Sequence, residues 1–505
     1  MIKKYRLELV RLFNIKIGFF IINILLYFFL IPLFEANKLI TTILFLLCYI
    51  YVFLSFYKKT IYFEKFLSIF LWFGFSFKIS LPFLVDSFGF TPVRFSEIPS
   101  QIQFSVDNYN DAVIYSIVGF CGFLTALFLR KKYIFNYDNE IQKIDHPIKN
   151  FYIKNSKKII YLFIFIFLLS AIINLQFEIY QKGINSYVTS FLLINIFKWL
   201  MLMGFTSYAC FIVFYEYVYK DNILFPSIIF VIESFFSNTS ILSRSYIFHI
   251  SILFLTLNDF FRKKILKKIY ILYFTIFFVI LLLFLNIFLT QNLRNCLMDT
   301  KLEHNSKNLF IHKCFFKEKI FEDNKIKNNN FNQRVNNSSV IINTGKKTLS
   351  LLLNRWVGFD SLIVIMSKKN ELNFNLYKKF LGEKKSSSEH SYYEDFFLEF
   401  ESDMGDRSNQ IFLPGYIAYQ SISGSKLFVF ISCFFIALIG SIIEKIAYRT
   451  SFKNFIFSGF ISYVLVFRII HFGYIPLNSL IYLFVILFTI YHIKFINFLV
   501  NKLIN

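Results

Sequence analysis

Proline and glycine are scarce in this chain, which has 8 Pro and 16 Gly in 505 residues. Acidic residues are also few, with 31 Asp or Glu against 54 Lys or Arg. Hydrophobic side chains instead make up 56% of the sequence, and the mean hydropathy is +0.56. This composition is typical of membrane proteins.

Cysteine is scarce too, with six scattered residues and no CxxC pair. This excludes a disulfide scaffold and a cysteine-ligated zinc site. Cys296 and Cys314 share one long predicted loop, so they could form a disulfide if that loop faces an oxidising compartment.

The sequence also lacks nucleotide and metal motifs. It contains no GxxxxGK[ST] and no GxGxxG that opens a helix after a strand, which argues against an ATP-driven pump. It has no HExxH or comparable His and carboxylate spacing for a metal. We therefore expect neither a metal nor another cofactor.

The formal charge of +23 would suggest nucleic acid in a soluble protein. Here Lys and Arg lie mostly in short segments between apolar runs, which is the positive-inside pattern of a polytopic membrane protein. The segments are the N-terminus, 58–65, 130–143, 261–268, 444–453 and the C-terminus. We expect all of them on the cytoplasmic side, and no nucleic-acid partner.

A membrane-spanning helix needs about 20 apolar residues. Apolar runs lie at 17–34, 39–57, 66–85, 112–129, 159–177, 191–218, 223–238, 245–260, 269–290, 425–442, 455–473 and 476–493. They predict an all-α polytopic protein of about 12 transmembrane helices with both termini cytoplasmic. The short runs at 223–238 and 245–260 form either two spans or a re-entrant hairpin. The first run lacks a small-residue cleavage site and is predicted to be a retained span.

The spans divide the chain into three consecutive parts. We predict a membrane bundle of about nine spans at 1–290, a large periplasmic loop at 291–424 and a bundle of about three spans at 425–505. Within the loop, LLLNRWVGFDSLIVIMS (351–367) is apolar but carries Arg355 and Asp360 near its centre. Each of these charges would cost about 2.5–3.5 kcal/mol in a membrane. We therefore predict an amphipathic or re-entrant helix that is covered on most sides.

Ionisable residues inside the predicted spans gather towards the outer ends of their helices. They are Lys78, Lys198, Glu233, Arg244, His249, Arg468 and His471. Each of these side chains could extend separately to the outer membrane–water interface. Alternatively, together with Arg355 and Arg407 of the loop, they form a cationic pocket.

A cationic pocket at this depth suits an anionic lipid head group, because guanidinium groups match phosphate oxygens in pairs and stay charged. Around a lipid pyrophosphate they would stabilise the charge that develops when its bond to a sugar breaks. The attacking sugar hydroxyl needs a general base, for which Asp360 and Glu233 are the candidates. Asp360 is equally a candidate for the structural ion-pair partner of an arginine.

Three segments resemble the oligosaccharide repeat-unit (O-antigen) polymerase family, as does the layout of spans around one dominant late loop. They are NTSILSRSYIFHISILF (238–254), NRWVGFD (354–360) and LPGYIAYQSISGSKLFVFISCFFIALIGSII (413–443). The resemblance implies that Arg244, Arg355 and Arg407 are the functional periplasmic arginines, with Gly358 and Gly415 as nearby backbone positions. SISGSK departs from the aromatic and paired glycines that family members often carry there.

The resemblance implies polymerisation of undecaprenyl-pyrophosphate-linked repeat units at the periplasmic face of the bacterial inner membrane, as in O-antigen or capsule biosynthesis. The implied partners are the lipid-linked glycans, membrane lipid and a chain-length regulator protein. An O-antigen ligase, or another glycosyltransferase that uses polyprenyl-linked sugars, is an alternative with the same donor. A lipid-linked oligosaccharide flippase or transporter is a second alternative. It would need polar groups in the cytoplasmic half as well, whereas the residues singled out above lie at one depth.

Overall fold

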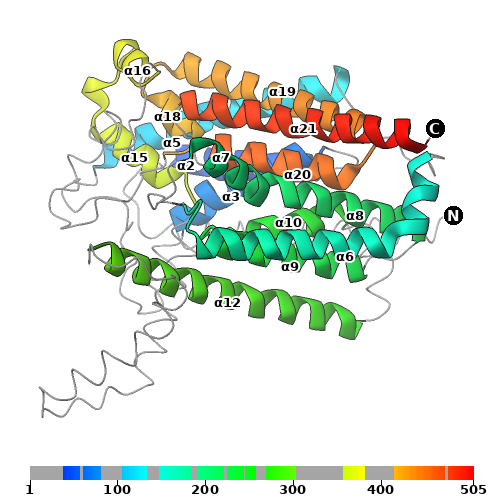
Figure 1. The fold of residues 1–505 in the computed structure, drawn as a ribbon. Coiled ribbons are helices and arrows are strands. Elements are labelled where there is room, and N and C mark those ends of the chain that lie inside the picture. The colour runs from blue at the N-terminus through cyan, green and yellow to red at the C-terminus, as the bar shows by residue number, and fades with distance from the viewer. Residues whose placement is uncertain are drawn as a thin grey trace, which may run out of the picture. The chain divides into compact units, whose positions relative to one another are not determined.

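The described part of the chain is all-helical (Figure 1). The computed structural model describes residues 38–56, 61–80, 105–133, 147–182, 190–220, 224–243, 245–257, 269–302, 356–381, 414–471 and 476–504. These residues contain no β-strand. The predicted all-α class is therefore confirmed for them.

Among the described residues, six helical segments are long and apolar enough to cross a membrane. They are α5 (Val106–Tyr133), α6 (Pro147–Gln176), α7 (Phe191–Trp199) with η2 (Leu200–Gly204) and α8 (Phe205–Lys220), α12 (Ile269–Leu302), α19 (Lys426–Thr450) and α21 (Pro476–Ile504). Each coincides with an apolar run of the sequence. These segments indicate a membrane protein.

The other described helices are shorter. They are α2 (Lys38–Ser55), α3 (Tyr62–Trp72) with η1 (Phe73–Phe77), α9 (Leu224–Ser240), α10 (Tyr246–Thr256), α15 (Phe359–Ser367), η4 (Lys369–Glu371), α16 (Phe374–Leu381), α18 (Tyr416–Ser421) and α20 (Phe455–Leu465) with η5 (Val466–His471). The helices α9 and α10 correspond to the two short apolar runs that were predicted to form either two spans or a re-entrant hairpin, and they have 17 and 11 residues. The predicted first span at 17–34 lies outside the described residues, so the count of twelve stays a prediction.

Large apolar side chains cover the exposed faces of the long helices. On α6, Tyr161, Leu162 and Phe165 are each more than half exposed. A helix that is apolar on all sides is expected in lipid, because in water such a surface would associate or aggregate. The pattern agrees with the membrane class deduced from composition.

The chain forms two compact units, each built from segments far apart in sequence. Unit 1 comprises Met1–Asp138, Lys346–Ile446 and Ile461–Ile486, and unit 2 comprises Asn139–Gly345, Ala447–Phe460 and Leu487–Asn505. In unit 1, α5 packs against α2, α15 and α18, while α3 packs against α2 and η5. In unit 2, α9 packs against α6, α8, α10 and α12. This grouping differs from the three consecutive parts predicted above, which follow membrane topology and not packing.

Three described helices contain a π-helical turn, and each turn is next to a buried polar side chain. η1 ends directly before Lys78, η2 ends two residues before Thr206, and η5 contains Arg468 and His471. A π-helical turn disturbs the regular backbone hydrogen bonds and is often found at functional sites.

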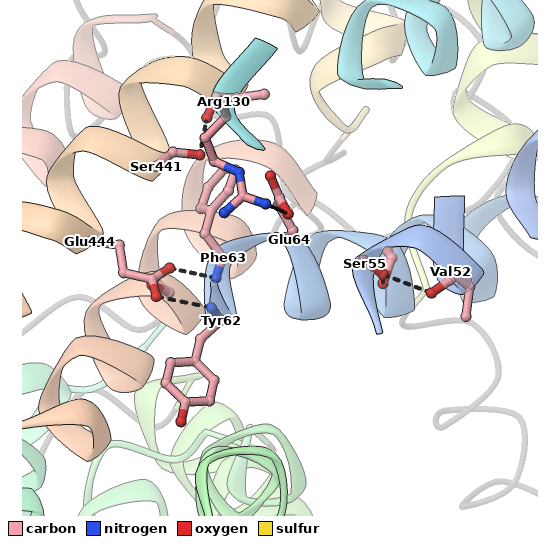
Figure 2. Close-up of polar contacts among 11 residues, drawn as sticks. Val52, Ser55, Tyr62, Phe63, Glu64, Arg130, Ser441 and Glu444 are labelled. Carbon is pink, nitrogen blue, oxygen red and sulfur yellow. Dashed lines mark hydrogen bonds and ion pairs between the residues drawn. The ribbon is translucent and has the colours of Figure 1, made fainter. Parts of the chain in front are cut away.

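Glu444 of α19 ties three helices of unit 1 together (Figure 2). Its Oε1 accepts a hydrogen bond from the Tyr62 N–H at 2.9 Å, and its Oε2 accepts one from the Phe63 N–H at 2.7 Å. The Ser462 hydroxyl of α20 donates to Oε2 at 2.7 Å. The first N–H groups of a helix have no partner within the helix and favour an anion. The N-cap residue of α3 is Ile61, whose side chain has no oxygen to accept these hydrogen bonds. Glu444 therefore takes the place of an N-cap side chain.

An ion pair lies close to the N-terminus of α3. The Arg130 guanidinium of α5 donates to Glu64 of α3 at 2.5 Å, and both side chains are almost completely buried (Figure 2). Glu64, Arg130 and Glu444 belong to the charged segments that were predicted to lie between the spans. The structure places all three inside helices, because α3, α5 and α19 continue beyond the apolar runs.

We predict that Glu444→Ala destabilises unit 1, because it leaves two backbone N–H groups and the Ser462 hydroxyl without their acceptor. Hydrogen bonds to a charged group are worth about 2 kcal/mol each. The midpoint of thermal denaturation in detergent should fall by several degrees. Glu371→Ala, which removes an exposed glutamate, is the control and should leave the midpoint unchanged. Equal midpoints for the two variants would refute the capping role.

Candidate functional site

A buried ion pair joins Lys78, which follows η1, to Asp360 in the first turn of α15. The Lys78 Nζ lies 2.8 Å from the Asp360 Oδ2, and the two side chains are 5% and 4% exposed. Lys78 Nζ also donates to the Trp356 carbonyl at 3.3 Å. Residues from the predicted third span and from the large predicted loop therefore meet in one place, although Lys78 and Trp356 are 278 positions apart in the sequence.

Two glycines bring the backbones of these segments together. A Cβ on Gly74 would overlap the Val357 carbonyl oxygen, and a Cβ on Gly358 would overlap the Gly74 carbonyl oxygen. Any side chain at either position would push α15 away from η1. The contact sets the distance across which Lys78 reaches Asp360.

The short helix α15 is enclosed by protein. Eight of its nine residues, Phe359–Met366, are buried. This confirms the prediction of a helix covered on most sides, although the helix begins at Phe359 and the stretch Trp356–Gly358 before it is not helical. Residues 351–355 lie outside the described part of the chain.

Trp356 belongs to a cluster of aromatic side chains next to the ion pair. Its ring stacks on Phe73 with centroids 4.0 Å apart, and Phe70 and His471 lie at 5.7 Å and 6.0 Å. His471 in turn contacts Phe70 at 4.8 Å. Two of the predicted site residues, Lys78 and His471, thus contact the same tryptophan from different helices.

A small cavity lies beside His471 and Gly358. Its volume is about 20 Å³, which is enough for one water molecule. Gly415 lines it with φ +79°, a conformation that favours glycine, and a Cβ there would lie 3.3 Å from the His471 carbonyl oxygen. Gly358 and Gly415, which the family resemblance singled out, therefore share one cavity.

One oxygen of the buried Asp360 carboxylate has no hydrogen-bond donor among the described residues. Its Oδ2 pairs with Lys78, whereas its buried Oδ1 accepts no hydrogen bond from the described residues. Burial raises the pKa of Asp360, and the Lys78 ammonium opposes this shift without cancelling it. A carboxylate with a raised pKa is a stronger proton acceptor than an exposed one.

The remaining predicted residues are distributed between the two units. Arg468 is buried in unit 1, where its guanidinium lies 5.2 Å from the Phe467 ring and 5.7 Å from the Tyr482 ring. Lys198, Glu233 and His249 belong to unit 2. Arg244, Arg355 and Arg407 lie outside the described residues, as does Cys314, so the question whether Cys296 and Cys314 form a disulfide stays open.

Glu233, the second predicted base, is completely buried among hydroxyl groups. The Ser237 hydroxyl donates to Oε1 at 2.8 Å, and Thr206 and Ser234 donate at 3.3–3.5 Å. None of the ion pairs formed by the described residues includes this carboxylate. Lys198 instead lies over the Tyr180 ring, 5.7 Å from its centroid. Glu233 is thus held by neutral donors of α8 and α9.

Sequence reasoning missed the buried charges at the N-terminal end of α3. Glu64, Arg130 and Glu444 were counted by sign and not by position within a helix. A helical projection extended one turn beyond each apolar run would have placed them on packed faces.

The described residues contain no group of three His, Cys, Asp or Glu side chains that could hold a metal ion. Within this part, Cys48, Cys121, Cys210 and Cys433 are free thiols. Comparison with family models, with curated proteins and with solved structures finds no match for this chain.

Replacing one partner of the buried ion pair should destabilise the protein more than replacing both. Lys78→Met or Asp360→Asn leaves a buried charge without its partner, at a cost of about 3–5 kcal/mol. The double variant K78M/D360N removes both charges and should recover most of that loss. Thermal denaturation of the four proteins in detergent measures the coupling. If the two single losses simply add in the double variant, the ion pair does not hold α15 in place.

Proposed function

We propose that this chain is a membrane glycosyltransferase that polymerises undecaprenyl-pyrophosphate-linked oligosaccharide repeat units at the periplasmic face of a bacterial inner membrane. The observation that carries the proposal is the buried Lys78–Asp360 pair with its available carboxylate oxygen, held beside Trp356. It supports the proposal because a group-transfer site needs a fixed base next to a position for the donor's leaving group.

The proposed reaction forms one glycosidic bond and breaks one bond to pyrophosphate. A hydroxyl of the acceptor repeat attacks the anomeric carbon of the donor glycan. The bond from that carbon to the pyrophosphate oxygen breaks, and its electron pair leaves with the lipid pyrophosphate. The hydroxyl proton passes to the Oδ1 atom of Asp360, while Lys78 keeps Oδ2 in position.

Arginines are proposed to stabilise the leaving pyrophosphate. Arg355 is assigned this role because it immediately precedes Trp356, whose carbonyl accepts a hydrogen bond from Lys78. Arg244 and Arg407 are assigned to the same charge-stabilising role by the family resemblance alone. Guanidinium groups suit the task because they stay charged and donate two parallel hydrogen bonds to phosphate oxygens. His471 and Arg468, both on η5, are proposed substrate contacts.

A flippase for lipid-linked oligosaccharides is the second candidate, and the buried charges at the N-terminus of α3 favour it. A transporter needs polar groups at several depths, whereas the ionisable residues singled out from the sequence are predicted to lie at one depth. Glu64 and Arg130 are buried near the start of α3, whereas Lys78 follows its π-helical end. Unit 1 therefore carries buried charge near both ends of one helix. Since Glu444 caps α3 and Arg130 pairs with Glu64, these groups are also explained by stability.

The polymerase proposal predicts that Arg355→Ala leaves the protein in the membrane but abolishes long glycan chains. Cells should then display only single-repeat surface glycan, because the transition state loses its charge stabilisation. Electrophoresis of surface glycan from a deletion strain complemented with each variant measures chain length. Lys378→Ala, which removes an exposed cation from the same predicted loop, is the control and should give normal chains. Normal chain lengths with Arg355→Ala would remove Arg355 from the site.

A reaction in detergent separates the two candidates. Detergent micelles have no second leaflet, so a flippase has no measurable product there. We expect purified protein to join lipid-linked repeats extracted from the deletion strain into a ladder on a gel. K78M/D360N should yield no ladder while denaturing close to the wild-type temperature. The absence of any ladder with the wild-type protein would favour the flippase.

A further inference from the structure

A second and larger cavity lies within unit 1, between α19, α21 and η5. Its volume is about 310 Å³, within the range of small-molecule sites. Apolar side chains form most of its wall, among them Ile436 and Ile439 of α19, Ile469 of η5, and Leu480 and Leu483 of α21. None of the catalytic steps proposed above uses this space.

The cavity opens onto an apolar surface. Two of its lining residues, Ile439 and Leu480, are 41% and 62% exposed, and they belong to α19 and α21, which are both long and apolar enough to cross a membrane. The surroundings that reach this opening are therefore hydrocarbon, and an occupant can enter sideways from the bilayer.

Polar side chains line the part of the cavity next to α16 and α18. Tyr377 of α16 and Gln420 of α18 lie there, and the Tyr377 hydroxyl donates to the Gln420 side-chain oxygen at 2.7 Å. Ser479 of α21 also lines the cavity. Figure 1 shows α16 and α18 beside the end of α19 that begins at Lys426. The wall further along α19 is purely aliphatic at Ile436 and Ile439. Such a gradient fits an amphiphile whose head lies towards α18.

The polar end is adjacent to the candidate catalytic site. Tyr416 and Ile470 line both this cavity and the small cavity that contains Gly358, Gly415 and His471. The ring of His471 contacts Trp356, whose carbonyl accepts from Lys78. A molecule with its tail in the large cavity could therefore place its head group next to the ion pair.

We propose that this cavity binds part of the prenyl chain of the lipid pyrophosphate donor, with the pyrophosphate directed past Tyr416 towards Lys78. The inference rests on the proposed function, which supplies the lipid donor. It adds the location of the tail and the route of entry, between α19 and α21. Burial of isoprenoid carbons against the aliphatic wall provides the affinity, and the head group provides the orientation.

The chain offers a matched pair of variants. Ile439→Trp introduces a large side chain into the opening, whereas Ile431→Trp makes the same change two turns earlier on α19, at a position that does not line the cavity. The two isoleucines are 41% and 39% exposed, so both tryptophans should be tolerated equally by the fold. Leu480→Trp blocks the opening from α21 and serves as the second test variant.

Native mass spectrometry of the purified protein in detergent measures the lipid that stays bound. The probes are undecaprenyl pyrophosphate, inorganic pyrophosphate and phosphatidylglycerol as competitor. We expect Ile439→Trp and Leu480→Trp to lower the affinity for undecaprenyl pyrophosphate on the order of tenfold, since each displaces several buried methylene groups. Affinity for inorganic pyrophosphate should not change, and Ile431→Trp should behave as the wild type.

Wild-type affinity for undecaprenyl pyrophosphate in both blocking variants would overturn the inference. So would equal competition by phosphatidylglycerol, because the cavity would then be a general lipid site. Neither result bears on the catalytic proposal, which fails separately if Arg355→Ala still makes long chains. Loss of undecaprenyl pyrophosphate binding together with normal binding of inorganic pyrophosphate supports the tail site.

Discussion

Charged side chains that leave water need a counter-charge or several hydrogen-bond partners, and this constraint determines how the helices of unit 1 meet. Lys78 pairs with Asp360, Arg130 pairs with Glu64, and Glu444 accepts two backbone N–H groups from α3. An unpaired charge at any of these positions would cost several kcal/mol. The helix α3 and its continuation η1 take part in all three contacts: Glu444 and Arg130 bind residues in the first turn of α3, and Lys78 directly follows η1. The other helices of these contacts are therefore positioned against α3.

The same constraint explains how a segment of the large predicted loop becomes part of the helical unit. Asp360 could not be buried alone, and the Gly74–Gly358 contact allows α15 to approach until Lys78 reaches it. The pair uses one carboxylate oxygen and leaves the other available. A contact that stabilises the fold thus also places a proton acceptor at a defined point, as a group-transfer enzyme requires.

In unit 2 the buried carboxylate of Glu233 is satisfied differently, although Glu216 there pairs with Lys220. Glu233 accepts from three hydroxyls, and Asn238 and Asn174 bond to serine and backbone groups near the same helix end. Hydroxyl donors stabilise a carboxylate less firmly than an ammonium or guanidinium does. Unit 1, with its ion pairs and both cavities, is therefore the better framework for the proposed chemistry.

The sequence determined the class of the protein. Apolar runs of sufficient length predicted the six long helices, because a span must satisfy its backbone within itself. The charges in LLLNRWVGFDSLIVIMS likewise predicted a covered helix, and α15 is one. Only the tertiary structure decided which charges pair. Lys78 and Asp360 lie 282 positions apart, and no local sequence pattern indicates that Asp360 meets this lysine. Ion pairing depends on which helices pack together, and that is a property of the whole unit.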